Sequence, residues 1–146
     1  MILAALAAFI GTIAFAVLFG VPKKYDLICG VAAAAGWVTY DLLTTFAGFT
    51  PTEATFAAAL LVTLISRFAA VRMACPATVF LITGIFPLVP GAGIYWTSYY
   101  LVSGQLDRGI DSGFAAIKAA IAIVLGIVFV FEVPGKVFQW VGKRQR

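Results

Sequence analysis

The sequence has no histidine, only two cysteines (Cys29 and Cys75) and few charged residues, which make up 11% of its 146 residues. The absence of histidine and of any Cys-x-x-Cys spacing excludes most metal sites and most thiol chemistry. We therefore expect no metal and no cofactor. The scarcity of charge also argues against an ordinary soluble domain, in which about a quarter of the residues are charged.

What the chain has in excess is apolar side chains, which make up 63% of it and give a mean hydropathy of +1.07. This composition is typical of an integral membrane protein. Because a spanning helix needs about 20 residues, the chain has room for roughly four to six spans and little else. We therefore expect a single all-α transmembrane domain over residues 1–146, with no soluble catalytic domain and no enzyme activity.

Five apolar runs, separated by turn signals and charges, predict five transmembrane helices. The first run resembles a signal peptide in its small-residue pattern at Ala14–Ala16, but it lacks a positively charged start and continues past that site, so we interpret it as a retained span. A basic tail at 133–146 follows the last run. The predicted spans cover residues of about 2–19, 27–49, 54–71, 75–102 and 114–131.

Lysine and arginine sort between the two sides of the membrane that five spans define. The positive-inside rule then places the N-terminus outside and the C-terminus in the cytoplasm. The excess of positive charge is explained by this sorting, so we expect no nucleic-acid partner. The positive side carries Lys23, Lys24, Arg67, Arg72, Lys136, Lys143, Arg144 and Arg146, whereas the loops of the other side carry Arg108.

The fourth run contains the stretch TGIFPLVPGAGIY, residues 83–95, in which prolines and glycines interrupt an apolar segment. Pro87 and Pro90 each lack a backbone N–H and disturb the helix at nearly the same depth. The freed backbone groups cannot face lipid, and broken helices near the membrane midplane form substrate sites in several transporters. We therefore expect the backbone from Gly84 to Gly93, including Gly91, to meet a substrate. A plain proline kink and a re-entrant loop, which would leave four spans, are the alternatives.

Two charges fall inside the predicted spans. Asp41 lies roughly 10 Å from the outer end of the second span and Lys118 roughly 7 Å from that of the fifth, at 1.5 Å per residue. A charge at such depth needs a partner or water and is a functional candidate. One expectation is that Asp41 and Lys118 couple charge, either by forming an ion pair or by sharing a cavity with the substrate. The alternative is that Lys118 snorkels to the interface and Asp41 bonds a hydroxyl such as that of Thr44. Arg67 is expected to snorkel as well.

The stretch PATVFLITGIFPLVPGAGIY, residues 76–95, resembles the threonine/serine exporter family, with Gly84, Pro87, Pro90, Gly91 and Tyr95 fitting its proline and glycine break. Size, span number and the basic tail make the whole chain similar to the small subunit of the two-component form, which corresponds to the C-terminal half of single-chain members. The resemblance implies proton-driven export of threonine, serine or dicarboxylates such as succinate across the bacterial inner membrane. It also implies a larger five-span partner subunit, to which a homo-oligomer is the alternative. The substrate-binding candidates are Gly84, Pro87, Pro90, Gly91, Gly93 and Tyr95.

Other functions remain as alternatives. A non-transporting assembly subunit would use the kinked helix only to shape an interface. An intramembrane enzyme is disfavoured, because Asp41 lacks a second deep carboxylate and no Ser/Lys arrangement lies near the break. A simple channel would need a ring of like charges or a filter-like carbonyl repeat, and neither is visible.

Overall fold

The computed structural model describes residues 2–135 and 138, and among these residues it contains helices and no strand. The all-α class predicted from composition is thereby confirmed. Two 3₁₀ turns, η1 (Lys23–Tyr25) and η2 (Phe86–Leu88), join longer helices. The α-helices of this part of the chain are α1 (Ile2–Leu18), α2 (Asp26–Thr45), α3 (Pro51–Met73), α4 (Thr78–Ile85), α5 (Gly91–Val102) and α6 (Leu106–Glu132).

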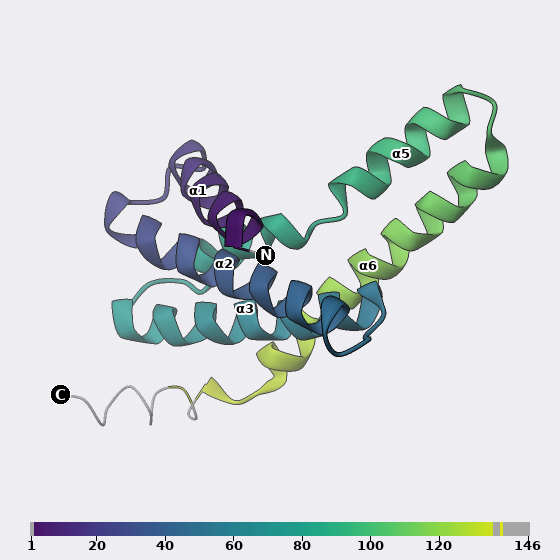
Figure 1. Cartoon of the computed structure of the whole chain (residues 1–146). Helices are drawn as coiled ribbons and strands as arrows, with labels where there is room; N and C mark the ends of the chain where they lie inside the picture. Colours follow the sequence, from purple (N-terminus) through teal and green to yellow (C-terminus); the bar gives the residue numbers. More distant parts are fainter. Residues whose placement is uncertain (1, 136–137, 139–146) are drawn as a thin grey trace.

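Helices α1 to α4 form a bundle in which α2 packs against α1, α3 and α4 (Figure 1). The packed faces consist mainly of small residues, which let helix backbones approach closely. A Cβ at Gly36 of α2, for example, would lie 2.4 Å from Val62 Cγ2 of α3. Most buried hydroxyls are satisfied within their own helix: Thr63 Oγ1, for example, donates to the Ala59 carbonyl at 2.7 Å. The buried Thr12 Oγ1 is an exception and has no partner among the described residues. The chain therefore brings its helices together through small side chains rather than through a large core.

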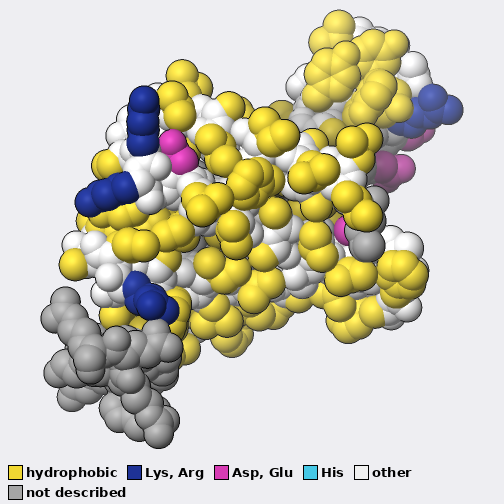
Figure 2. Space-filling model, turned by 60° about the vertical axis from the view of Figure 1, so that its left-hand side comes forward, with side chains coloured by type: hydrophobic (Ala, Val, Ile, Leu, Met, Phe, Trp, Pro, Cys, Tyr) yellow, Lys and Arg dark blue, Asp and Glu magenta, His cyan; other side chains and the backbone are white. Residues whose placement is uncertain are grey.

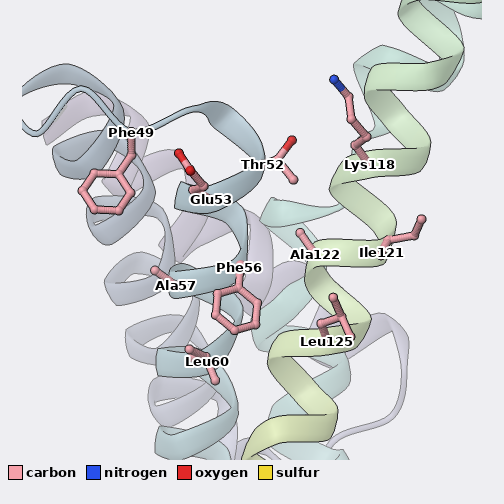
Figure 3. Close-up of a pocket in the computed structure, with 10 residues that line it drawn as sticks. All are labelled: Phe49, Thr52, Glu53, Phe56, Ala57, Leu60, Lys118, Ile121, Ala122 and Leu125. Atoms are coloured by element: carbon pink, nitrogen blue, oxygen red, sulfur yellow. The ribbon is translucent and has the colours of Figure 1, made fainter.

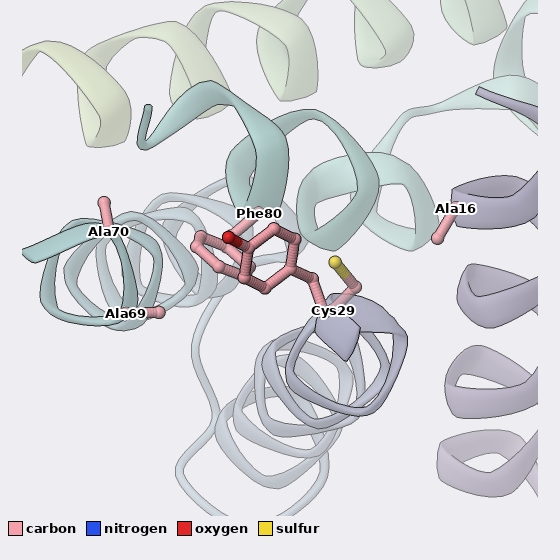
Figure 4. Close-up of a cluster of buried hydrophobic side chains, with 6 residues drawn as sticks. Ala16, Cys29, Ala69, Ala70 and Phe80 are labelled. Carbon is pink, nitrogen blue, oxygen red and sulfur yellow. The ribbon is translucent and has the colours of Figure 1, made fainter. Parts of the chain in front are cut away.

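The largest fully buried side chain is that of Phe80. It meets the Tyr25 ring edge to face, with ring centres 5.4 Å apart, and packs beside Cys29 and the small residues Ala69 and Ala70 (Figure 4). Aromatic pairs of this geometry stabilise a core beyond their area alone. This cluster joins the short helix α4 to the start of α2 and the end of α3.

A capping box fixes the start of α3. The Thr50 side chain accepts a hydrogen bond from the Glu53 amide at 3.4 Å, and Glu53 Oε2 accepts from the Thr50 amide at 2.8 Å. Pro51 follows at the first helical position, where its missing N–H costs nothing because that N–H would have no partner in the helix. These contacts fix the residue at which α3 begins.

Arg67 holds the end of α6 against α3. Its Nη1 donates to the carbonyl oxygens of Val130, Phe131 (3.4 Å) and Val133 (2.8 Å). The last carbonyls of a helix have no intrahelical partner and favour a positive charge. Arg67 therefore caps α6, where the sequence predicted a side chain that snorkels to the interface.

Helix α5 and the first half of α6 form a hairpin that projects from the bundle (Figure 1). Glycines allow the close approach: a Cβ at Gly93 would lie 3.0 Å from Ala116 Cβ, and one at Gly109 would lie 3.0 Å from Leu101 Cδ2. Helix α5 has no buried residue. Most of its surface is therefore available to lipid or to another polypeptide.

Within the described residues, three helices are long and apolar enough to cross a membrane: α2 with η1, α3, and α6. The pair formed by α4–η2 and α5 passes the same test jointly, which gives up to four spans. Helix α1 is apolar but has only 17 residues. The five-span count and the orientation stay predictions. Figure 2 shows apolar side chains over most of the visible face, with Lys and Arg side chains near its ends.

Two helices differ in extent from the apolar runs that predicted them. Helix α2 ends at Thr45 rather than near 49, because Gly48 turns the chain with a φ of 68° and the Phe49 amide donates back to the Leu43 carbonyl. Helix α6 begins at Leu106 rather than near 114. Its first turns contain charged residues, which excluded them from the apolar run but do not prevent a helix. The basic tail lies largely outside the described residues.

Candidate functional site

The proline and glycine segment breaks the helix at two carbonyls. In a continuous α-helix the N–H of residue 87 would bond to the Thr83 carbonyl and that of residue 90 to the Phe86 carbonyl, but Pro87 and Pro90 have no N–H. In the structure the Phe86 amide donates to the Thr83 carbonyl, and the Val89 amide donates to the Phe86 carbonyl at 3.2 Å. Each carbonyl thus accepts from the residue one position earlier, which tightens the chain into η2. The helix axis bends by 48° between α4–η2 and α5.

A cavity of about 300 Å³ lies beside this break. Its wall combines the break with residues from the second half of α2, the first two turns of α3, and α6. The break therefore lies level with the start of α3 and the second half of α2, which is nearer to one end of the bundle than to its middle. The lining residues are Trp37, Tyr40, Pro51, Thr55, Pro87, Leu88, Val89, Pro90, Gly91, Ala92 and Ala119.

The start of α5 supplies backbone donors at the cavity. The Gly91 amide donates to the Val89 carbonyl at 2.7 Å and the Ile94 amide to the Pro90 carbonyl at 3.1 Å. The N-cap residue Pro90 gives no side-chain hydrogen bond to the first turn. The Ala92 amide, at the cavity wall, therefore has no acceptor among the described residues, and a helix start of this kind attracts anions.

Trp37 contributes a second unsatisfied donor. Its indole Nε1 is buried and has no hydrogen-bond partner among the described residues. A buried polar atom without a partner is rare, and Thr12 Oγ1 and Asp26 Oδ1 are the other two among the described residues. The Trp37 ring lies 5.6 Å from the Tyr40 ring, centre to centre, so the two aromatic rings form one wall of the cavity.

The structure divides the substrate-binding residues predicted from the sequence. Pro87, Pro90 and Gly91 line the cavity. Gly84 instead packs against α3, where an added Cβ would lie 3.0 Å from Val62 Cγ1. Gly93 packs against Ala116 of α6.

Tyr95 also lies away from the cavity wall. Its side chain is 62% exposed. Its ring stacks within an aromatic group on α5 that includes Trp96 and Tyr99. The roles of all six candidates in substrate binding stay predictions.

The two charges predicted to couple lie on different helices. Asp41 is next to Tyr40 near the end of α2, and the Thr44 hydroxyl donates to the backbone carbonyls of Tyr40 and Asp41 at 2.9 and 3.2 Å. Lys118 Nζ lies 5.2 Å from the centre of the Phe114 ring, and its side chain lines a groove between α3 and α6, not the cavity at the break. The coupling of Asp41 with Lys118 stays a prediction.

The sequence analysis missed the cavity residues that lie outside the break, which are Trp37, Tyr40, Pro51, Thr55 and Ala119. Trp37 and Tyr40 are the aromatic residues among them. Both sit in an apolar helix with no local motif, and only their position near the break distinguishes them. The Trp-x-x-Tyr spacing places them on one helix face, which was a signal that the sequence contained. No group of three or more His, Cys, Asp or Glu residues in the described part of the chain could hold a metal ion.

Comparison with known proteins identifies the family. The sequence model of the family described as threonine/serine exporter, ThrE, matches residues 4–133, which include every helix of the structure except the first two residues of α1. No curated protein and no solved structure matched the chain in the two other comparisons. A family match over this length covers the bundle, the break and the hairpin together, and so this membrane protein belongs to the threonine/serine exporter family.

Proposed function

We propose that this chain is one component of an exporter that carries small carboxylate-bearing solutes out of the cell and binds them at the broken helix. Membership of an exporter family supports the membrane transport function. The observation that carries the proposed site is the cavity of about 300 Å³ at the break, whose lining includes Ala92, with an unbonded backbone amide, and Trp37, whose unbonded indole N–H is itself buried. Its volume is at the lower end of ligand pockets, as expected for a small solute.

A carboxylate fits the chemistry of this cavity. The first turn of α5 presents N–H groups and the positive end of a helix dipole, both of which favour an anion. The aromatic rings of Trp37 and Tyr40 give the rest of the wall an apolar surface with polar edges. Threonine, serine and succinate all carry the required carboxylate, so the site is proposed for the class rather than for one member.

Transport is proposed to use the proton gradient, with Asp41 as the group that takes up or balances charge. Asp41 is adjacent in sequence to Tyr40 of the cavity wall and lies in a helix with the composition of a membrane span. Carboxylates in such segments commonly serve as proton relays. We further propose that the protein lies in the bacterial inner membrane with the basic tail in the cytoplasm, and that a larger five-span subunit completes the transport path.

Efflux from sealed vesicles that contain this chain and its partner subunit tests the proposal. Threonine and succinate are loaded separately, and their exit is followed under an imposed proton gradient. We expect gradient-dependent efflux of at least one of them. Gly91→Leu should lower the rate per assembled complex, because the space beside Gly91 is open and a leucine there would fill the cavity. Absence of efflux for both solutes would overturn the substrate class.

Gly11→Leu is the matched control, since it adds the same side chain on α1 at a position that also has open space beside it. Equal rates per complex for Gly91→Leu and the wild type would overturn the proposed site.

A second candidate function is a non-transporting assembly subunit. The observation in its favour is the projecting hairpin, because α5 has no buried residue and offers its surface to another chain. This reading expects Pro87→Ala to lower the yield of the complex while transport per assembled complex stays the same.

A further inference from the structure

A groove distinct from the cavity at the break runs between α3 and α6 (Figure 3). These two helices run in the same direction, since Lys118 is level with the start of α3 and Gly126 packs against Ala59 further along. The volume of the groove is about 540 Å³. Its lining residues are Phe49, Thr52, Glu53, Phe56, Ala57, Leu60, Lys118, Ile121, Ala122 and Leu125.

The polarity of the groove changes along its length. Thr52, Glu53 and Lys118 lie at one end, and Leu60 and Leu125 lie at the other, as Figure 3 shows. The polar end coincides with the capped start of α3, where the chain passes from a loop into an apolar helix. From Lys118 to Leu125 the helix rises roughly 10 Å, about two thirds of one leaflet of a hydrocarbon core about 30 Å thick.

We propose that this groove holds one membrane phospholipid, with its headgroup at the polar end and an acyl chain along the apolar walls. A transmembrane helix would meet the groove with similar side chains along its length, whereas a lipid has one charged end and one hydrocarbon end. Lysine on a membrane-facing surface attracts lipid phosphate. The small side chains of Ala57 and Ala122 leave room for the acyl chain between the larger side chains of Phe56 and Ile121.

Glu53 specifies the class of headgroup. Both of its bonds to Thr50 use Oε2, so Oε1 can accept from a further donor. A headgroup that carries a primary ammonium beside its phosphate offers a cation with N–H donors to Glu53 and an anion to Lys118. A choline headgroup keeps the positive charge but has no N–H to donate. The groove should therefore retain an ethanolamine-type phospholipid more strongly than a choline-type one.

Native mass spectrometry of the purified complex, titrated with phosphatidylethanolamine and with phosphatidylcholine of matched acyl chains, tests the proposal. For the wild type we expect about fivefold greater retention of the ethanolamine lipid. Lys118→Gln should lower the retention of both lipids, whereas Glu53→Gln should keep the helix cap and remove the preference between them. Lys24→Gln, which removes the same charge at η1, should leave retention unchanged.

A steric pair of variants completes the test. Ala57→Phe should fill the groove and reduce lipid retention several-fold, whereas Ala120→Phe on the exposed side of α6 should not. Equal retention by wild type, Lys118→Gln and Ala57→Phe would overturn the proposal. So would loss of the partner subunit in Ala57→Phe with unchanged lipid retention, because the groove would then be a protein interface.

Discussion

Replacing Trp37 with phenylalanine separates a ligand-binding role from a packing role. If the indole N–H binds the carboxylate of a transported solute, its removal deletes a hydrogen bond to a charged group, for which about 1.5–3 kcal/mol is typical. Binding of the solute should then weaken by about 10- to 150-fold. In the ligand-free protein the same N–H is buried without a partner among the described residues, which costs about 1–3 kcal/mol. Removing it should leave the stability of the ligand-free protein unchanged or raised.

A ligand-binding role thus predicts weaker solute binding without a loss of stability in the ligand-free protein, whereas a packing role predicts the reverse. The assay is thermal unfolding of the purified complex in detergent, with and without threonine or succinate, together with the concentration dependence of efflux. Trp96→Phe is the matched control, because Trp96 is 45% exposed on the hairpin and stacks on Tyr100. Lower ligand-free stability of Trp37→Phe, combined with unchanged affinity for the solute, would refute the reasoning and assign Trp37 to packing alone.

Three further predictions concern the helix contacts and the proposed proton coupling. Arg67→Met should lower stability by about 2–4 kcal/mol because it uncaps α6. Thermal unfolding of Arg72→Met, which removes a contact to the exposed ring of Phe68, should change little. Gly126→Ala should destabilise the α3–α6 contact by about 1–3 kcal/mol, since the new Cβ would lie 2.8 Å from Ala59 Cβ; Gly11→Ala, with open space, is the control in the same unfolding assay. Asp41→Asn should abolish the dependence of efflux on the proton gradient, and gradient-dependent efflux at the wild-type rate would leave Asp41 with a structural role.

Local sequence features predicted the class of the fold and the position of the break along the chain. Apolar runs of span length with few charges allow only helices in a membrane, because backbone groups must be satisfied within the segment. Pro87 and Pro90 remove backbone donors whatever surrounds them, so a bend at 86–90 follows from covalent structure. The family resemblance, which rested on the same stretch, is confirmed over residues 4–133.

Hydropathy was less informative about the ends of the helices. It does not register a helix that continues through polar residues, as α6 does from Leu106, nor a turn set by one glycine, as at Gly48. The position of Arg67 near the end of the third apolar run predicted that it snorkels to the interface, but it did not indicate that Arg67 donates to α6. The carbonyls that Arg67 caps lie more than sixty residues further along the chain, and no local pattern connects the two.

Composition and the covalent geometry of proline were enough to predict an all-α membrane protein with a helix broken by prolines. The exporter family was indicated by the motif at residues 76–95 and is shown by the family match over residues 4–133. The surroundings of the break, in contrast, depend on how the helices pack. This packing brought Trp37 and Tyr40 to the cavity, and turned Gly84 and Gly93 toward neighbouring helices. The reason is that helix contacts depend on which small residues face one another across the bundle, and that pairing is set by the whole chain rather than by any one segment.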